Sequence, residues 1–434
     1  MSEAQEIDPA IQTITLGCRL NIAETEAIRT QLASRTGTDR LIVVNSCAVT
    51  EEAVRSTGRV IRRAKRENPS ARLVVTGCAA QVDPDRFAAM DEVDLVLGNS
   101  EKADLPSYLP MLQASFGTGN GLAPPAAPKI HVTDIMQVDD TAPQLAAAFT
   151  SHARAFVEVQ NGCDHRCTFC IIPYGRGNSR SVPAGAVIEQ VQALVDQGHR
   201  EIVLTGVDVT SYGHDLPGQP ALGHLLERLL VHVRGMERLR LSSLDSIEID
   251  DRMFDLLTGE KRVMPHLHLS LQAGDNMILK RMKRRHNREQ AIAMVERLKA
   301  ARPEIATGAD IIAGFPTESE AMFTNSLRLI DDCDIVYGHI FPYSPRNGTP
   351  AARMPQLSPA LIKERAARLR EACGKRQTAF LSSLAGTEQV MLVERDGCSG
   401  HAENFASIRL EKPLPPGHIA PVTIKRVEKG ILIA

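Results

Sequence analysis

The chain of 434 residues is longer than one ordinary domain, so we expect two or three domains. Hydrophobic residues make up 43% and charged residues 24%, which excludes a disordered or fibrous protein. The formal net charge of −2 gives no indication of a polyanionic partner, so any such indication must come from local clusters of basic residues.

The compartment is predicted from three features of the sequence. Residues 1–10 are polar and acidic, without the basic start and apolar run of a signal peptide. No stretch approaches the roughly 18 to 20 apolar residues that a membrane-spanning helix needs. We therefore expect a cytoplasmic protein, in which nine cysteines indicate metal binding or redox chemistry rather than disulfides.

An N-terminal region, residues 1–105, alternates apolar runs with stretches of helical spacing. The expected strands are 11–18, 41–47 and 72–78, and the expected helices between them are 24–35 and 50–68. Alternation of this kind predicts an α/β domain with an open parallel sheet covered by helices.

The rest of the chain divides into three further parts. Residues 106–150 are rich in Gly, Pro and Ala and indicate a linker. Residues 151–385 return to the alternation and predict a partial (β/α)6 barrel, since six units are fewer than the usual eight. Residues 386–434 predict a small β domain. The expected barrel strands are 154–160, 201–207, 238–244, 266–271, 308–314 and 335–343.

Three cysteines with C-x3-C-x2-C spacing follow the first barrel strand: Cys163, Cys167 and Cys170. Three thiolates within eight residues can bind one corner of an iron–sulfur cube and leave one iron open. A structural zinc site normally has four ligands, and His165 lies inside the motif. A Cys3His zinc site is therefore the alternative.

A second set of cysteines stands at the ends of the three N-terminal strands: Cys18, Cys47 and Cys78. In an open parallel sheet, ligands bind beyond the carboxyl ends of the strands, so the three thiols are expected to form one site. The alternative is three independently buried cysteines, because free cysteine is among the most buried residue types.

The first set, with Phe169 before its last cysteine, resembles the signature of the radical S-adenosylmethionine (SAM) superfamily. The resemblance implies a 4Fe–4S cluster whose open iron binds SAM. An electron from the cluster would then cleave SAM to a 5′-deoxyadenosyl radical. It also implies a partial barrel, with the cluster at the mouth where barrel active sites form.

The segments 16–27, 45–50 and 76–81 around the second set resemble the N-terminal domain of the methylthiotransferases. The resemblance implies that Cys18, Cys47 and Cys78 hold an auxiliary 4Fe–4S cluster, whose open iron carries the sulfur to be inserted. One SAM molecule would methylate that sulfur, and a second would supply the radical.

Polar groups at barrel strand ends are candidates for binding SAM. The segments 204–208 and 269–274 resemble family segments that line the SAM pocket, although ordinary loop and cap chemistry is the alternative for each residue. The predicted cofactor-binding residues are Phe169, Thr205, Gly206, Asp208, Ser243 and Gln272.

Basic residues cluster at 55–66, 280–285 and 363–376, which suits contacts to RNA phosphates, although a solvated face is the alternative. Residues 391–410 are similar to the small RNA-binding TRAM domain of methylthiotransferases, where an aromatic ring can stack on a base. The predicted RNA-binding residues are Arg62, Arg63, Arg284, Arg285, Asn404 and Phe405.

The segments 16–27, 159–181 and 339–354 together look most like the threonylcarbamoyladenosine branch of the family. The predicted product is 2-methylthio-N6-threonylcarbamoyladenosine at position 37 of tRNA. The predicted partners are the tRNA anticodon stem-loop and an electron donor, with no DNA and no membrane. Alternatives are methylthiolation of isopentenyladenosine in tRNA or of a ribosomal-protein aspartate, and a non-catalytic zinc protein that binds RNA.

Overall fold

A computed structural model describes residues 11–33, 40–108, 128–139, 149 and 152–434. The chain forms two compact units, each described here by itself. The first unit comprises residues 1–148 together with 161–165 and 170–178, and the second comprises 149–160, 166–169 and 179–434. The short loop after the first barrel strand is thus divided between the two units.

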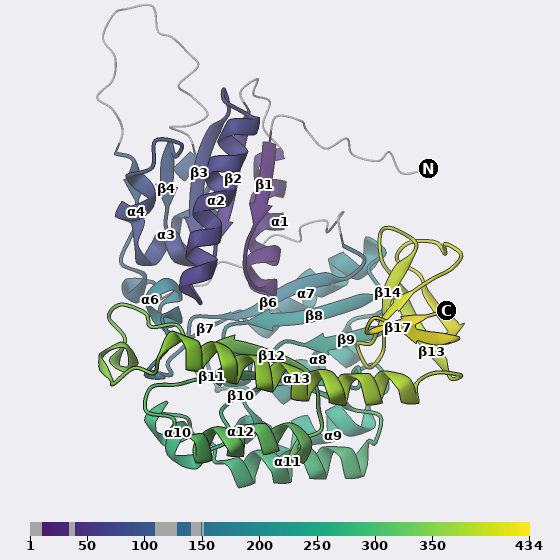
Figure 1. The fold of residues 1–434 in the computed structure, drawn as a ribbon. Coiled ribbons are helices and arrows are strands. Elements are labelled where there is room, and N and C mark those ends of the chain that lie inside the picture. The colour runs from purple at the N-terminus through teal and green to yellow at the C-terminus, as the bar shows by residue number, and fades with distance from the viewer. Residues whose placement is uncertain (1–10, 34–39, 109–127, 140–148, 150–151) are drawn as a thin grey trace, which may run out of the picture. The chain divides into compact units, whose positions relative to one another are not determined.

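The first unit contains a sheet of five parallel strands in the order β1-β2-β3-β4-β5. Figure 1 shows the first four strands with helices beside them. The strands are β1 (Ile11–Thr15), β2 (Leu41–Ser46), β3 (Arg72–Gly77), β4 (Leu95–Leu97) and β5 (Ile130–His131). The open parallel sheet predicted for this region is confirmed, and β5 comes from the segment whose composition indicates a linker.

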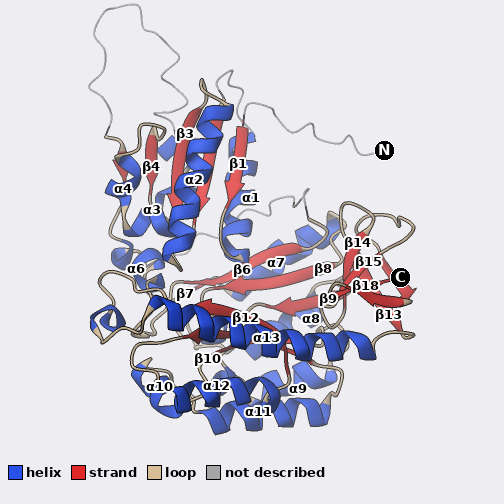
Figure 2. Ribbon diagram, in the orientation of Figure 1, coloured by secondary structure: helices blue, strands red, loops and turns tan. Residues whose placement is uncertain are grey.

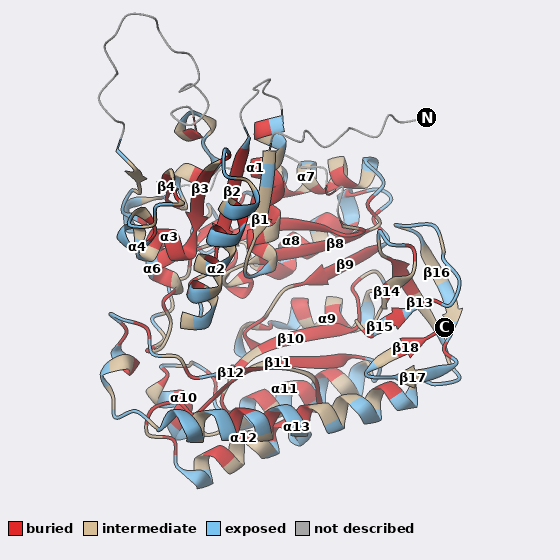
Figure 3. Ribbon diagram, turned by 45° about the horizontal axis from the view of Figure 1, so that its top comes forward, coloured by how far each residue is buried: buried red, intermediate tan, exposed pale blue. Residues whose placement is uncertain are grey.

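The first unit also contains helices, drawn in blue in Figure 2, and 3-10 turns. The helices are α1 (Arg19–Ala33), α2 (Glu51–Glu67), α3 (Cys78–Val82), α4 (Pro84–Ala88) and α6 (Ile172–Arg176), and the 3-10 turns are η1 (Glu101–Ala103), η2 (Leu105–Tyr108) and η3 (Ile135–Gln137). All but α6 and η3 lie between the strands β1 to β5, and α6 follows β6 (Ala155–Asn161). The start of α2 is fixed by Thr50, whose side chain accepts the N–H of Ala53.

Alternation along the strands explains why both faces of this sheet are covered. Ile42 and Val44 of β2 belong to a core that contains residues of α2, α3 and α4. Leu41 and Val43, which point to the opposite face, belong to a second core with residues of α1. A sheet buried on both faces reads as a continuous apolar run, as β2 does. Because both faces are covered, polar side chains of this sheet can gather at the carboxyl ends of its strands.

The second unit contains six parallel strands, confirming the predicted partial barrel. They form two hydrogen-bonded groups, β6-β8-β9 and β10-β11-β12, joined by an isolated bridge between Leu244 and Leu269. The strands are β6 (Ala155–Asn161), β8 (Glu201–Gly206), β9 (Arg238–Leu241), β10 (His266–Gln272), β11 (Ala306–Ala313) and β12 (Ile335–Pro342), with the short β7 (Arg180–Ser181) beside β6.

Helices follow the barrel strands in the order of the chain (Figure 1). They are α7 (Ala184–Asp196), α8 (Leu222–His232), α9 (Asp251–Gly259), α10 (Asn276–Arg281), α11 (Arg288–Ala301), α12 (Glu320–Asp332) and α13 (Pro359–Ser383), with 3-10 turns η4 (Val209–Ser211), η5 (Ser246–Glu248) and η6 (Pro350–Arg353). Figure 3 shows buried strands and helices that are exposed on one side.

The C-terminal β domain is a six-stranded sheet in the order β16-β13-β14-β15-β18-β17. Its strands are β13 (Glu388–Val393), β14 (Ser399–Ala402), β15 (Ser407–Arg409), β16 (Ile419–Thr423), β17 (Arg426–Glu428) and β18 (Ile431–Ile433). Met391, Ile408 and Leu432 form its core together with Leu381 at the end of α13, so the helix and the domain pack as one body.

Buried arginines fix the β domain to the barrel. Arg240 donates to the carbonyls of Ala402 and Glu403 at 2.8 Å each and to the Glu201 carboxylate at 2.8 Å. Arg154 pairs with Glu394 of the β domain. Because Glu201 has no exposed side-chain surface, its charge depends on these guanidiniums.

Within the described part of the chain, every helix is either too short or too polar to cross a membrane. The domain boundaries at 105, 150 and 385 stay a prediction. Most of the expected linker, residues 109–127 and 140–148, lies outside the described residues.

Candidate metal centres

The three N-terminal cysteines all stand at one edge of the first unit's sheet. Cys47 and Cys78 follow directly after β2 and β3, and Cys18 lies in the turn after β1. Since the strands are parallel, these positions meet at the carboxyl edge, as the sequence predicts. The sequence predicts each of the three as the last residue of its strand, but none is: Cys18 and Cys47 lie in the loops that follow, and Cys78 is the first residue of α3.

Backbone geometry brings Cys18 and Cys47 together. Gly17 has φ of +107°, and a Cβ there would lie 2.9 Å from the Cβ of Cys47 and 3.2 Å from its Sγ. Only glycine allows so close an approach. Burial raises the pKa of the Cys47 thiol to about 11, and the neighbouring Cys78 and Cys18 add to the rise. A positive centre bound to Cys18 and Cys47 would offset this rise in pKa.

One arginine, Arg176, contacts this cysteine group. The Nε of Arg176 lies 3.1 Å from the Sγ of Cys78, in hydrogen-bond geometry. Arg176 belongs to α6, only six residues after Cys170, and this segment is part of the first unit. A Cβ on Gly175 would lie 3.3 Å from the Cβ of Cys78, so the glycine allows α6 to approach α3 closely. Arg176 was not among the residues predicted from the sequence.

A buried charge network fixes this arginine. Its Nη1 lies 2.6 Å from Glu24 Oε1, and Lys102 Nζ lies 2.6 Å from Glu24 Oε2. All three side chains are at most 5% exposed. Burial alone would raise the pKa of Glu24, but Arg176 and Lys102 outweigh it and lower the pKa to about 2. The network carries one net positive charge beside the thiols. Arg176 works against the rise in the pKa of Cys18 and of Cys47, but burial outweighs it.

Asparagines hold the network in place. Asn21 accepts from Arg176 Nη2 at 2.8 Å, and its Nδ2 donates to the carbonyls of Leu16 and Ser46. Asn45, the second residue before Cys47, donates to Glu24 Oε2 and to the hydroxyl of Thr25. The polar residues of the three strand ends are thus connected to each other, which sets the positions of the cysteines between them.

This donor set fits an iron–sulfur cluster. It offers three soft thiols at one sheet edge, a positively charged network beside them and an N–H donor aimed at sulfur. Independent burial of the cysteines does not explain an ion network of three charged groups at the same edge.

The second cysteine loop begins in the first unit. Cys163 donates its backbone N–H to the carbonyl of Gly177 at 3.0 Å. Gly162 has φ of +71°, and a Cβ there would lie 1.8 Å from the carbonyl oxygen of Asn178. The two ends of the loop therefore meet beside Cys163, and the close approach there requires glycine at position 162. Cys163 and Cys170 group with the first unit, and Cys167 groups with the second.

Within the second unit, Cys167 has its own arginine. Arg284 Nη1 lies 3.7 Å from the Cys167 Sγ, while Nη2 donates to Asp245 Oδ2 at 2.9 Å and to the Ser270 carbonyl at 2.7 Å. The Arg284 side chain is 8% exposed. Its burial directs the guanidinium to Cys167 and Asp245 rather than to solvent, so its placement gives no support to the RNA contact predicted for it.

The ends of barrel strands β6 and β8 are joined by one buried side chain. Gln160 Oε1 accepts the N–H groups of Val207 and Asp208 at 3.0 and 2.8 Å. A Cβ on Gly206 would lie 2.6 Å from the Gln160 carbonyl, so a glycine is needed there. The two carboxylate oxygens of Asp208 accept the hydroxyls of Thr210 and Ser211. These contacts shape the rim of the barrel.

The other residues predicted to bind SAM also lie at strand ends. Thr205 is buried in β8, and Ser243 is half-buried after β9. Gln272 ends β10 with φ of +67°, an unusual conformation at an irregularity in the pairing with β11. Phe169 packs edge-on against Phe315 in the core at that end of the barrel. Their contacts to SAM stay a prediction.

The predicted RNA contacts on α2 lie on an exposed face. Arg62 and Arg63 are 55% and 73% exposed at their side chains, and Arg63 pairs with Glu67 at 2.8 Å. The positive charge of the basic cluster at 55–66 is therefore partly neutralised by acidic residues that flank it. Arg285 pairs with Glu248 and is 43% exposed. All three remain candidates for phosphate contacts.

Two predicted RNA residues of the β domain are engaged inside the second unit. Phe405 stacks against His266 and His401 at ring-centroid distances of 4.8 and 4.7 Å, and Arg240 lies 5.2 Å from its centroid. Asn404 is buried and accepts the N–H of Ala406. A base could stack on Phe405 only if one of these partners moved.

Known protein families match both the barrel region and the N-terminal region of the chain. Residues 157–330 match the radical SAM superfamily, and residues 10–98 match an uncharacterised protein family, UPF0004. A threonylcarbamoyladenosine tRNA methylthiotransferase from Rickettsia prowazekii (strain Madrid E) is 46% identical over 421 residues, covering 97% of this chain and 96% of that protein. The chain belongs to the radical SAM tRNA methylthiotransferase family. It is accordingly a transferase.

Two further comparisons define the range of this similarity. A tRNA-2-methylthio-N(6)-dimethylallyladenosine synthase from Parafrankia sp. (strain EAN1pec) is 36% identical, covering 82% of this chain and 72% of that protein. A radical SAM methyltransferase from Kitasatospora setae shares the fold, with a TM-score of 0.54, 15% identity and coverage of 79% of this chain and 75% of that one. Radical SAM enzymes use SAM and a 4Fe–4S cluster.

Proposed function

We propose that this methylthiotransferase converts N6-threonylcarbamoyladenosine at position 37 of tRNA into its 2-methylthio derivative in the cytoplasm, with two 4Fe–4S clusters and an external electron donor. The anticodon stem-loop would be the part of the tRNA that is bound. The observation that carries the proposal is the cysteine group of the first unit, with the Arg176–Cys78 contact and the Glu24–Lys102 network. A radical enzyme that only generates a 5′-deoxyadenosyl radical needs no second group of this kind.

Cys163, Cys167 and Cys170 would hold one cluster, and Cys18, Cys47 and Cys78 the other. When bound, the first cluster supplies the electron that cleaves SAM, and the second supplies the sulfur for insertion. Arg176 would neutralise negative charge on Cys78 and orient its sulfur, and Arg284 would do the same for Cys167. Gln160 would keep the loop after β8 open at the barrel rim.

The identity values favour the threonylcarbamoyl substrate, since the relative from Rickettsia prowazekii is closer than the dimethylallyladenosine synthase from Parafrankia. To test this, the anaerobically reconstituted enzyme is given SAM, a reductant and tRNA that carries either threonylcarbamoyladenosine or isopentenyladenosine. Nucleosides from the digested tRNA are then identified by mass spectrometry.

The expected result is a gain of one sulfur and one CH2 on threonylcarbamoyladenosine alone. A product on isopentenyladenosine would assign the enzyme to the other tRNA branch. Product on neither tRNA, with methylthiolation of a ribosomal-protein aspartate, would overturn the tRNA assignment of the substrate.

A further inference from the structure

Three side chains with metal-binding atoms meet on the β10-β11-β12 sheet of the second unit, and no cysteine belongs to the group. His268 Nε2 lies 2.9 Å from Asp310 Oδ1, and His339 Nδ1 lies 3.3 Å from the same oxygen. All three donor atoms lie within 4.8 Å of one another, and the two imidazole centroids are 4.4 Å apart. The group is therefore one compact cluster contributed by three neighbouring strands.

The strand register explains how the cluster forms. Asp310 pairs directly with His339, and His268 pairs with Gly308, two residues before Asp310 on the same face of β11. A Cβ on Gly308 would lie 2.5 Å from His268 Nδ1. Because glycine leaves that position empty, the His268 ring leans across it and reaches Asp310. The glycine at position 308 thus makes the contact between His268 and Asp310 possible.

The distances suit a small divalent cation. In a tetrahedral zinc site with bonds of about 2.0 Å, donor atoms are separated by about 3.3 Å. The two measured separations, 2.9 and 3.3 Å, require little adjustment to reach that value. Two imidazoles and one carboxylate are the ligand set of many catalytic zinc and non-haem iron sites, which keep a further position open.

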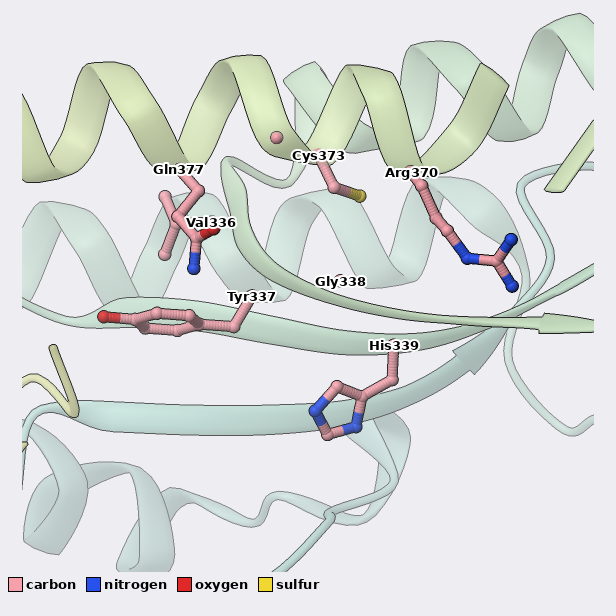
Figure 4. A pocket seen from close by; sticks show the side chains of 8 residues that line it. Val336, Tyr337, Gly338, His339, Arg370, Cys373 and Gln377 are labelled. Atoms are coloured by element: carbon pink, nitrogen blue, oxygen red, sulfur yellow. The ribbon is translucent and has the colours of Figure 1, made fainter. Parts of the chain in front are cut away.

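The cluster lies on the face of the β10-β11-β12 sheet that turns away from α13, and it is open to solvent there through His339. The side chain of His339 is 62% exposed, that of Asp310 20% and that of His268 7%. His339 also lines a pocket of about 240 Å³, together with Tyr337, Arg370 and Cys373 (Figure 4). In this view the His339 ring points away from α13. An ion could reach the three side chains from the face of the sheet opposite α13 and keep a solvent ligand.

We propose that His268, Asp310 and His339 form a mononuclear site for a divalent first-row transition metal ion, with Zn²⁺ as the expected native ion. Protein ligands fill three positions, and solvent or a substrate oxygen takes the open one. The site is distinct from both cysteine groups in its donor chemistry: its ligands are nitrogen and oxygen, whereas the cysteine groups offer sulfur.

The test uses the cluster-loaded enzyme, so that the six cysteines of the two cysteine groups are already occupied. After dialysis against Co²⁺, bound cobalt is counted by elemental analysis, and its visible absorption is recorded as the difference from the same cluster-loaded enzyme without cobalt. We expect about one equivalent of cobalt per chain, with d–d bands but no thiolate-to-metal charge transfer. Zn²⁺ should displace it.

His339→Gln and Asp310→Asn should each weaken the binding roughly 100-fold, because each removes one of three protein ligands. His232→Gln, an exposed histidine at the end of α8, is the matched control and should bind as the wild type does. His339 is exposed, so its variant should fold normally, which circular dichroism checks. Absence of bound cobalt, equal binding by all variants, or thiolate charge transfer would each overturn the proposal.

Discussion

Each unit pairs one cysteine with one buried arginine, but the two pairs differ in how tightly they are held. Arg176 approaches Cys78 at 3.1 Å, and its side chain is 2% exposed. Arg284 approaches Cys167 at 3.7 Å, and its side chain is 8% exposed. The shorter and more buried contact is the stronger one, because a hydrogen bond gains strength where water is excluded.

The counterions of the two arginines differ as well. Arg176 makes two contacts with Glu24, whose other charged partner, Lys102, is also buried. Asp245, the counterion of Arg284, lies 3.5 Å from His286 and 4.0 Å from the half-exposed Arg285. The difference teaches that the first site holds its arginine in a buried network of three charges, whereas the counterion of the second arginine is shared with Arg285, which lies nearer to solvent.

The largest effects separate the two cysteine groups. Cys167→Ala should abolish SAM cleavage, because it removes a ligand of the cluster that supplies the electron. Cys78→Ala should leave SAM cleavage at wild-type order of magnitude and abolish methylthiolation of tRNA. Chromatography of 5′-deoxyadenosine and of the modified nucleoside measures both. Loss of cleavage in the Cys78→Ala enzyme would show that the division of labour between the groups is wrong.

Arg176→Gln should have the next largest effect. It leaves Glu24 buried with one cation fewer and removes the donor to Cys78, a change that costs about 3–5 kcal/mol. We expect selective loss of iron from the first unit, measured by electron paramagnetic resonance of the two reduced clusters. Arg63→Gln, 73% exposed on α2, is the matched control. Normal loading of both clusters in the Arg176→Gln enzyme would contradict the claim that the contact between Arg176 and Cys78 stabilises the cluster of the first unit.

Arg284→Gln should reduce SAM cleavage while retaining iron, because its contact with Cys167 is longer. We expect a fall of about 10- to 100-fold in the rate of cleavage, as for the loss of other residues that support metal ligands. The neighbouring Arg285→Gln should cleave SAM normally. If Arg284→Gln instead lowered only the affinity for tRNA, the RNA contact predicted from the sequence would be the correct interpretation of this arginine.

Acid should weaken the first unit through Glu24. The pKa of Glu24 is about 2 in the folded chain, against an ordinary value of 4.5. Stability from its ion pairs, about 3 kcal/mol by linkage, is therefore complete above pH 4.5 and is lost as the pH falls towards 2. Urea unfolding of the cluster-free protein should show Glu24→Gln less stable at pH 7, with the difference shrinking below pH 4.5. A difference that stays constant with pH would exclude this role.

The smallest effect concerns the outer face of α2. Replacing Arg62 and Arg63 by Glu should weaken tRNA binding by about 10-fold at 0.1 M salt and reduce its salt dependence, if both contact phosphates. SAM cleavage should not change. Filter binding at several salt concentrations gives both quantities, and an unchanged slope would mean that this face is only solvated.

The cysteine groups could be predicted from the sequence because spacing and strand ends carry the signal. Arg176 and Glu24 could not, because each reaches the site through folding: one lies on a helix far along the chain, and the other is one of two acids in α1. The flanking glycines in Gly175-Arg176-Gly177 were the available signal for Arg176. The basic run 280–285 predicts an RNA contact for Arg284, and only the structure shows that its buried guanidinium also lies beside Cys167.

The most direct test of the central claim is the iron and acid-labile sulfide content of the reconstituted wild type and of two triple Ala variants, one for each cysteine group. Two independent cubes predict about eight irons in the wild type and about four in each variant. About four irons in the wild type, unchanged when Cys18, Cys47 and Cys78 are replaced, would show that the first unit holds no cluster.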